Sequence, residues 1–191
     1  CTGHGVPGAF TSMICSEKLT DSVKQSIIPG EMLSIVNKGI KITLKQAEST
    51  ESTKDGMDIA LCSFDFKNRI VHYAGANRPL WIIRKDSKEI EEIIATKTAI
   101  GGHTKDDQIF DTHPIQMQQG DTFYIFSDGY ADQNGGNEDK KLMTKKFKQI
   151  LIDIQVKPMR EQKNYLDEFI TKWMGANTEQ RDDILVIGVR I

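Results

Sequence analysis

The spacing of apolar residues switches between two periods along this chain of 191 residues, and the switch limits the folds open to it. Helical spacing marks the segments 6–25, 31–45, 142–154 and 159–174. Short strand-like runs lie between these segments, and one more ends the chain. The order of helices, strands, helices and a final strand predicts an α+β fold in one domain, residues 1–191.

Strand-like runs fill the middle of the chain and its end. They cover residues 57–66, 70–74, 80–84, 112–117, 122–126 and 184–191. Residues 67–69 predict a hairpin turn, and the runs 112–117 and 122–126 are expected to pair with each other. The final run is nearly all apolar or β-branched, which favours a buried central strand. The polar segment 48–56 predicts a surface loop.

Charge and cysteine content exclude several classes of protein. Lys and Arg total 25 against 27 for Asp and Glu, so the net charge of -2 gives no reason to expect a nucleic-acid partner. Cys1, Cys15 and Cys62 are too few and too irregularly spaced for a disulfide framework or a zinc site, which favours a reducing compartment. No apolar run reaches the roughly 18–20 residues that span a bilayer. A cytoplasmic location is expected, including the cytoplasmic end of a membrane-anchored sensor.

Two acidic sites stand next to predicted strands. Asp128 directly follows the run 122–126, and Asp182 with Asp183 precedes the final run. Carboxylates held at the ends of rigid strands are the ligands that hard cations such as Mg²⁺ or Mn²⁺ require. The alternative is that these residues only form turns, because Asp-Gly is an ordinary turn signal.

The glycine-rich opening, residues 2–10, is a third candidate. Closely spaced glycines let the backbone approach an ion or a phosphate at a helix N-terminus. His4 is a candidate ligand or acid, although a histidine in such a turn commonly just bonds nearby backbone. Cys1 with His4 suggests a thiol nucleophile, but nothing in the sequence orients that pair.

Together these segments resemble one family, the stage-II-sporulation-E and sigma-regulator branch of the metal-dependent, type 2C-like (PPM) serine/threonine protein phosphatases. The matching segments are Cys-Thr-Gly-His-Gly-Val-Pro-Gly-Ala-Phe at 1–10, Tyr-Ala-Gly-Ala-Asn-Arg-Pro-Leu at 73–80, Ala-Ile-Gly-Gly at 99–102, Gly-Asp-Thr-Phe-Tyr-Ile-Phe-Ser-Asp-Gly-Tyr-Ala-Asp at 120–132 and Arg-Asp-Asp-Ile-Leu-Val-Ile at 181–187. The resemblance implies a four-layer α-β-β-α sandwich of two antiparallel sheets flanked by helices.

The resemblance also implies a metal centre with two Mn²⁺ or Mg²⁺ ions that share a bridging water. Asp128 and Asp182 match the family's metal-binding acids, Asp183 is a neighbour able to share that role, and Cys1 matches the residue whose backbone carbonyl joins the metal shell.

Further candidates stand around this centre. Gly129 and His4 are candidates for the second shell or for substrate contact, and so is Asp132, although structural roles are the alternative for His4 and Asp132. Asn77 and Arg78 are candidates to meet the phosphate, with a solvent-exposed turn as the alternative for the arginine.

The chain departs from the family pattern at its start. The aspartate that precedes the glycine-rich motif in the family, and the earlier strands that carry a Gly-Gly-Asp-type acid, are not among these residues. We therefore expect a phosphatase domain lacking its first strands, which folds largely but binds Mn²⁺ weakly and has little activity.

The implied function is hydrolysis of phosphoserine or phosphothreonine on a regulatory protein resembling an anti-sigma-factor antagonist. The domain would be the output end of a bacterial signalling protein, controlled by a sensor upstream in the same chain, with the segments 6–25 and 31–45 as the control element. Two alternatives stay open. One is a catalytically silent module that binds a phosphoprotein or forms a homodimer through its first helix pair, and the other is a hydrolase of small phosphoesters.

Overall fold

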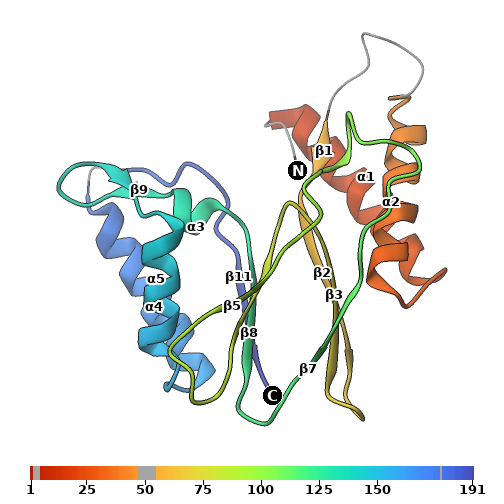
Figure 1. Cartoon of the computed structure of the whole chain (residues 1–191). Coiled ribbons are helices and arrows are strands. Elements are labelled where there is room, and N and C mark those ends of the chain that lie inside the picture. Colours follow the sequence, from red (N-terminus) through yellow and green to blue (C-terminus); the bar gives the residue numbers. More distant parts are fainter. Residues whose placement is uncertain (2–4, 47–54, 177) are drawn as a thin grey trace. The chain divides into compact units, whose positions relative to one another are not determined.

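The structure is a computed structural model that describes residues 1, 5–46, 55–176 and 178–191 (Figure 1). Contacts divide these residues into two compact units. Unit 1 comprises residues 1–80 and 93–117, and unit 2 comprises residues 81–92 and 118–191. The single domain expected over residues 1–191 stays a prediction.

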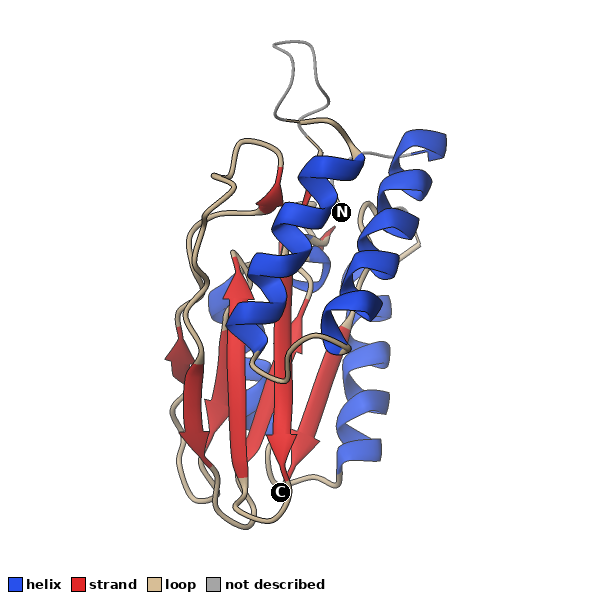
Figure 2. Ribbon diagram, turned by 90° about the vertical axis from the view of Figure 1, so that its right-hand side faces the viewer, coloured by secondary structure: helices blue, strands red, loops and turns tan. Residues whose placement is uncertain are grey.

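Unit 1 consists of a helix pair and short antiparallel sheets. Its elements are α1 (Gly5–Val23), α2 (Pro29–Thr43), β1 (Gly56–Met57), β2 (Ile59–Asp65), β3 (Ile70–Ala76), β6 (Ile100–Gly101) and β7 (His113–Gln116). Strands β2, β3 and β7 form one antiparallel sheet in that order, and β1 pairs with β6. Figure 2 shows α1 and α2 side by side in front of the strands. The predicted helix pair and the β2–β3 hairpin are confirmed.

The core of unit 1 follows from the helical spacing of α2. Leu33, Val36 and Ile40 lie three and four residues apart, so they share one face of the helix, and all are fully buried. They pack in one cluster with Ala74 of β3 and Cys15 of α1. Pro29 occupies the first turn of α2, where its missing N–H leaves no hydrogen bond unmade.

Unit 2 consists of a sheet, a small hairpin and three helices. Its elements are β4 (Leu80–Ile83) without its first residue, β5 (Glu91–Ile93) without its last, β8 (Thr122–Phe126), α3 (Gly129–Asp132), β9 (Asn134–Gly135), β10 (Lys140–Lys141), α4 (Thr144–Ile154), α5 (Met159–Met174) and β11 (Val186–Arg190). The sheet has the order β11-β8-β4-β5, with β8 antiparallel to both neighbours, and β9 pairs with β10.

Aromatic side chains form the centre of the unit 2 core. Trp81, Tyr130 and Phe147 are almost fully buried, and the Tyr130 and Phe147 rings stack with centroids 4.5 Å apart. Leu151 of α4 and Ile170 of α5 join the same cluster. The apolar faces of α4 and α5 therefore pack into the core of this unit.

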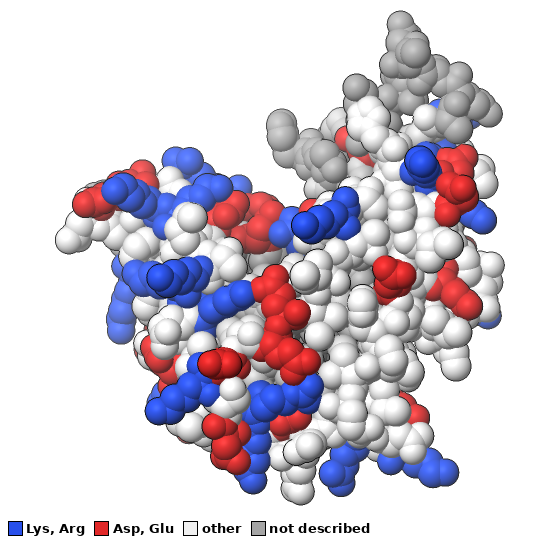
Figure 3. Space-filling model, viewed as in Figure 1, with Lys and Arg blue, Asp and Glu red and all other residues white. Residues whose placement is uncertain are grey.

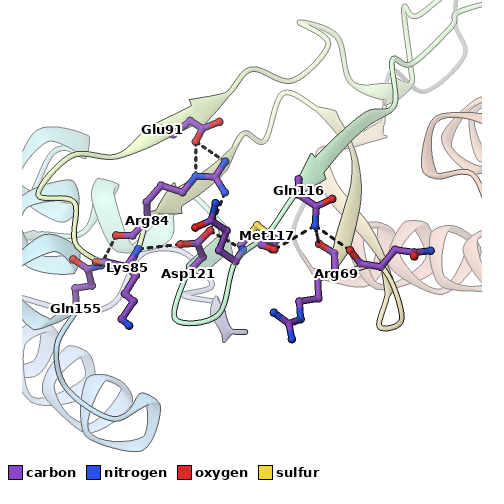
Figure 4. A network of polar contacts seen from close by, with 10 residues as sticks. Arg69, Arg84, Lys85, Glu91, Gln116, Met117, Asp121 and Gln155 are labelled. Atoms are coloured by element: carbon purple, nitrogen blue, oxygen red, sulfur yellow. Dashed lines mark hydrogen bonds and ion pairs between the residues drawn. The ribbon is translucent and has the colours of Figure 1, made fainter.

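A buried carboxylate fixes the start of β8 (Figure 4). Asp121 accepts hydrogen bonds from the backbone N–H groups of Gln118, at 3.0 Å, and Lys85, at 2.9 Å, and from the Arg84 guanidinium at 2.9 Å. Burial raises the pKa of Asp121, but these donors outweigh it and hold the pKa below its ordinary value. The carboxylate thereby joins the end of β4 to the turn before β8.

Two predictions about strands are wrong. Among the described strands β11 is at the edge of its sheet, not at its centre, and its residues alternate between half-buried, such as Val186, and exposed, such as Ile187 and Val189. Strands β7 and β8 do not pair with each other, because β7 joins β3 whereas β8 lies between β4 and β11. The turn at Gly120, with a φ of 96°, leads from one sheet into the other.

The fold class is confirmed, since antiparallel sheets and helices make up both units. Within the described part of the chain, no helix has the length and apolar character needed to cross a membrane. The loop predicted over residues 48–56 lies mostly outside the described residues.

Candidate functional site

Asp128 stands between a strand and a helix of unit 2. Strand β8 ends at Phe126, and α3 begins at Gly129. The Asp128 side chain makes no capping hydrogen bond to α3, although aspartate at this position commonly does. It is half-buried, and its backbone carbonyl accepts the Asp132 N–H at 2.9 Å. The carboxylate is therefore held at a fixed strand end without being used to cap the helix.

Ser127 closes the end of the β8–β11 ladder. Beyond the Phe126–Val186 pair, the Ser127 N–H donates to the Leu185 carbonyl at 3.0 Å. The Ser127 hydroxyl donates to the Asp183 carbonyl at 2.7 Å and accepts the Leu185 N–H at 2.9 Å. One side chain thus ties the segment before β11 to the residue preceding Asp128.

Gly129 allows the two acidic segments to touch. A Cβ atom there would lie 2.4 Å from the Asp183 carbonyl oxygen, closer than real contacts allow. Asp182 and Asp183 are exposed, and the Asp183 N–H donates to Asp182 Oδ1 at 2.8 Å. The structure therefore places the Asp183 backbone against Gly129, so that the segment carrying Asp182 and Asp183 lies beside the turn that contains Asp128.

The donor atoms at this site fit a hard cation in kind. Carboxylate and carbonyl oxygens are the ligands preferred by Mg²⁺ and Mn²⁺. They supply only part of a coordination shell, because within residues 1, 5–46, 55–176 and 178–191 no three His, Cys, Asp or Glu side chains form a group able to hold a metal.

Asn77 and Arg78 share a partner in unit 1 that sequence reasoning missed. The Asn77 amide donates to Asp58 Oδ1 and the Arg78 guanidinium to Asp58 Oδ2, each at 2.9 Å. Asn77 has a φ of 57°, and its N–H donates to the Thr96 carbonyl at 2.9 Å. The turn is thus fixed on several sides. The available signal was a carboxylate interrupting the apolar run between Met57 and Ile59.

Three further candidates chosen from the sequence are Cys1, His4 and Asp132. Cys1 is exposed, and His4 lies outside the described residues. Asp132, at the end of α3, forms an ion pair with Lys141 at 2.9 Å, which gives it a structural role on the surface.

Comparisons with known proteins agree with one another. The family model described as "Stage II sporulation protein E (SpoIIE)" matches residues 1–191. No curated protein sequence matches the chain. Among solved structures, the chain is similar to the SiaA-PP2C domain of Pseudomonas aeruginosa, with 27% identity and a TM-score of 0.85, over 100% of this chain and 73% of that one.

Two further structures share the fold at lower identity. The PP2C phosphatase domain with a fragment of the regulatory domain of SpoIIE from Bacillus subtilis has 18% identity and a TM-score of 0.73, over 100% of this chain and 52% of that one. RsbX in complex with magnesium has 16% identity and a TM-score of 0.62, over 97% of this chain and 75% of that one. The SpoIIE phosphatase domain was also crystallised presoaked with Mn.

Proposed function

Because the chain belongs to the SpoIIE family over residues 1–191 and has the fold of PP2C-type protein phosphatases, we propose that it hydrolyses phosphoserine or phosphothreonine on a regulatory protein in a metal-dependent reaction. The regulatory protein would resemble an anti-sigma-factor antagonist. The domain would act as the output of a bacterial signalling protein whose upstream part senses the signal.

One observation carries the proposal. Asp128 follows β8 directly, and Gly129 leaves room for the Asp183 backbone against the same turn. The Ser127 hydroxyl stabilises this contact with one hydrogen bond that it donates, to the Asp183 carbonyl, and one that it accepts, from the Leu185 N–H. The backbone of the Asp183 segment is thus held against the turn that contains Asp128, and a fixed backbone is the support that the ligands of a metal shell need.

Asp128, Asp182 and Asp183 are the residues we propose as ligands of Mn²⁺ or Mg²⁺, with the backbone carbonyl of Cys1. Divalent ions in such a site polarise phosphoryl oxygens and lower the pKa of a water. The carboxylates of this chain supply the negative charge that attracts the cations, and the Ser127 contacts keep the acidic segments from separating.

Arg78 is a proposed contact for the substrate phosphate. One guanidinium nitrogen of Arg78 donates to Asp58 Oδ2, and the Asn77 amide donates to the other oxygen of the same carboxylate. The guanidinium is therefore oriented before substrate binds. A planar guanidinium recognises phosphate oxygens well because it offers several N–H groups in one plane. An arginine held in this way loses less conformational entropy on binding.

The test is an assay of the full-length protein with Mn²⁺, on a phosphoserine peptide and on an aryl phosphate. We expect hydrolysis of the peptide, abolished by a chelator and restored by Mn²⁺. Hydrolysis of the aryl phosphate alone would favour the small-phosphoester hydrolase. A folded protein inactive on both would favour the silent phosphoprotein-binding or dimerising module.

A further inference from the structure

A lysine-rich segment of unit 2 follows the candidate metal site in the chain. From residue 140 to residue 148 every charged side chain is positive, and the segment contains no acid. Its lysines are Lys140, Lys141, Lys145, Lys146 and Lys148. All but the last are exposed. Figure 3 shows basic side chains over the β9–β10 hairpin and α4, with acidic ones among them.

Backbone bonds fasten this lysine segment, residues 140–148, to α3. The Leu142 N–H donates to the Gln133 carbonyl at 3.0 Å, and the Met143 N–H donates to the Ala131 carbonyl at 2.7 Å. Helix α3 runs only from Gly129 to Asp132, a single turn of about 6 Å beginning next to Asp128. The middle of the lysine segment is therefore bonded to the chain within about one helical turn of the candidate metal acid.

Trp173 of α5 makes the base of this segment rigid. Its indole N–H donates to the Gln133 carbonyl at 3.0 Å, and its backbone carbonyl accepts the Gly136 N–H at 2.8 Å. The Lys146 ammonium lies 3.8 Å from the centre of a Trp173 ring, a cation–π contact that keeps the charge in place. The positive charges are thus presented on a fixed support.

The sequence of α4 opposes helix stability at this point. Helix N-termini favour acidic side chains, yet the first turn of α4 contains Lys145 and Lys146 and no acid. Met143 caps the helix without a side-chain hydrogen bond, and its φ of 72° is unusual for a residue other than glycine. Residues that lower the stability of a helix without an evident structural gain are typical of functional surfaces.

Part of the charge is already compensated within unit 2. Lys141 pairs with Asp132, Lys140 with Glu138, and Lys148 with Glu92. The first two pairs are exposed, and such ion pairs are weak enough to exchange for a competing carboxylate. Lys145 and Lys146 add charge at the positive end of the α4 dipole. The surface is therefore suited to an acidic partner.

We propose that the lysine segment, residues 140–148, is a docking surface for an acidic stretch of the phosphoprotein substrate, close in sequence to its phosphoserine. This proposal rests on the proposed function and adds a feature of the substrate. An extended peptide advances about 3.3 Å per residue, so carboxylates about three to six residues from the phosphoserine would reach the lysines while the phosphate is at the acids.

Two labelled phosphoserine peptides test the proposal on the full-length protein. One carries Asp and Glu three to six residues from the phosphoserine on both sides, and the other carries Asn and Gln there. We expect tighter binding of the acidic peptide in fluorescence anisotropy at low salt. The preference should fade when the ionic strength rises toward about 1 M, where charges are screened within about 3 Å.

Lys145→Glu should weaken binding of the acidic peptide about fivefold and leave the neutral peptide within about twofold. Lys88→Glu is the matched control, because Lys88 is also an exposed lysine of unit 2. It lies in the turn after β4, and the hydrogen bond from the Lys85 N–H to Asp121 holds this turn at the start of β8, whereas Asp128 follows the end of that strand. Equal losses in the two variants, or equal binding of the two peptides, would overturn the proposal.

Hydrolysis separates this proposal from the proposed function. If the protein hydrolyses both peptides at equal kcat/KM and binds them equally, the phosphatase function stands and the docking surface falls. If it binds the acidic peptide preferentially but hydrolyses neither, the docking surface stands and the phosphatase function falls. If Lys145→Glu instead abolishes binding to anionic vesicles and leaves peptide binding intact, the surface serves a membrane and the proposal is wrong.

Discussion

The two ends of strand β8 carry the same residue type in opposite settings. At the start of the strand, Asp121 is 2% exposed and accepts hydrogen bonds from two backbone N–H groups and a guanidinium. At the other end, Asp128 is half-buried and leaves the helix that follows it without a side-chain cap. A carboxylate surrounded by three donors of its own protein stabilises the fold, whereas Asp128 lies where a strand passes into a short helix beside the Asp183 backbone, which is where we propose a metal ligand.

The largest effect should come from Asp128→Asn. Asparagine preserves the shape of the side chain, so we expect the melting temperature to change by no more than about 2 °C. Loss of a charged ligand should reduce Mn²⁺-dependent turnover by about 100-fold or more. Mutating a residue that only supports a ligand typically lowers activity by about 10- to 100-fold, and losing the ligand itself should cost at least as much. Steady-state kinetics across a Mn²⁺ titration measure this. Undiminished turnover at saturating Mn²⁺ would remove Asp128 from the site.

Asp121→Asn should produce the reverse pattern. The amide would place an N–H₂ group against donors that need an acceptor, and it would leave Arg84 without that charge partner. We expect unfolding in urea to become easier by about 2–3 kcal/mol, with kcat per folded molecule unchanged. Glu91→Gln is a milder control because Glu91 is an exposed partner of the same arginine. A kinetic defect without loss of stability would contradict the structural role of Asp121.

Gly129→Ala tests whether the contact between Gly129 and the Asp183 backbone supports the proposed metal site. Its methyl group would meet the Asp183 carbonyl at 2.4 Å, so the segment before β11 must move. We expect a loss of about 1–3 kcal/mol in stability, together with a higher Mn²⁺ requirement for activity. Gly39→Ala is the control, because the nearest atoms there belong to the flexible Lys18 side chain, and the helix interior favours alanine. Normal Mn²⁺ dependence in Gly129→Ala would separate Asp183 from the metal site.

Protonation of Asp121 in acid should have the smallest effect on stability, because it removes the charge of the carboxylate but keeps the shape of the side chain. The pKa of Asp121 is held below its ordinary value in the folded protein, because the two backbone N–H groups and the Arg84 guanidinium favour the charged carboxylate. Its contribution is therefore complete above about pH 4 and is lost as the pH falls through the folded pKa. Urea titrations below pH 4 should show a shallower loss of stability for Asp121→Asn than for the unchanged protein. Parallel curves would show that this carboxylate does not couple folding to protons.

Sequence reasoning located elements best where the apolar period was long or sharply bounded. Residues 122–126 and 159–174 were predicted with the bounds that the structure has. Strands such as β6, β9 and β10 contain two residues each, too few to show a period. The edge position of β11 was missed because an unbroken apolar run does not reveal how many neighbours a strand has.

The contacts around the candidate site could be predicted only in part, for a similar reason. Asp128 was found from its place at a strand end, but the partners of Ser127 and Arg78 are distant in sequence. The Ser127–Asp183 bond spans 56 residues and the Arg78–Asp58 bond spans 20. Averages hide local features as well, since a net charge of -2 gave no sign of the lysine segment at 140–148.

The position of the tryptophans has a practical consequence. The chain contains 2 of them, Trp81 and Trp173, and both belong to unit 2. Indole emission therefore reports the melting of unit 2 alone, whereas far-ultraviolet circular dichroism registers the helices of both units. Superimposable urea transitions from the two signals would mean that residues 1–191 unfold as one cooperative body, and separated transitions would reveal two. The two tryptophans thus report, without an attached label, on the unfolding of the unit that contains Asp128, Asp182 and Asp183.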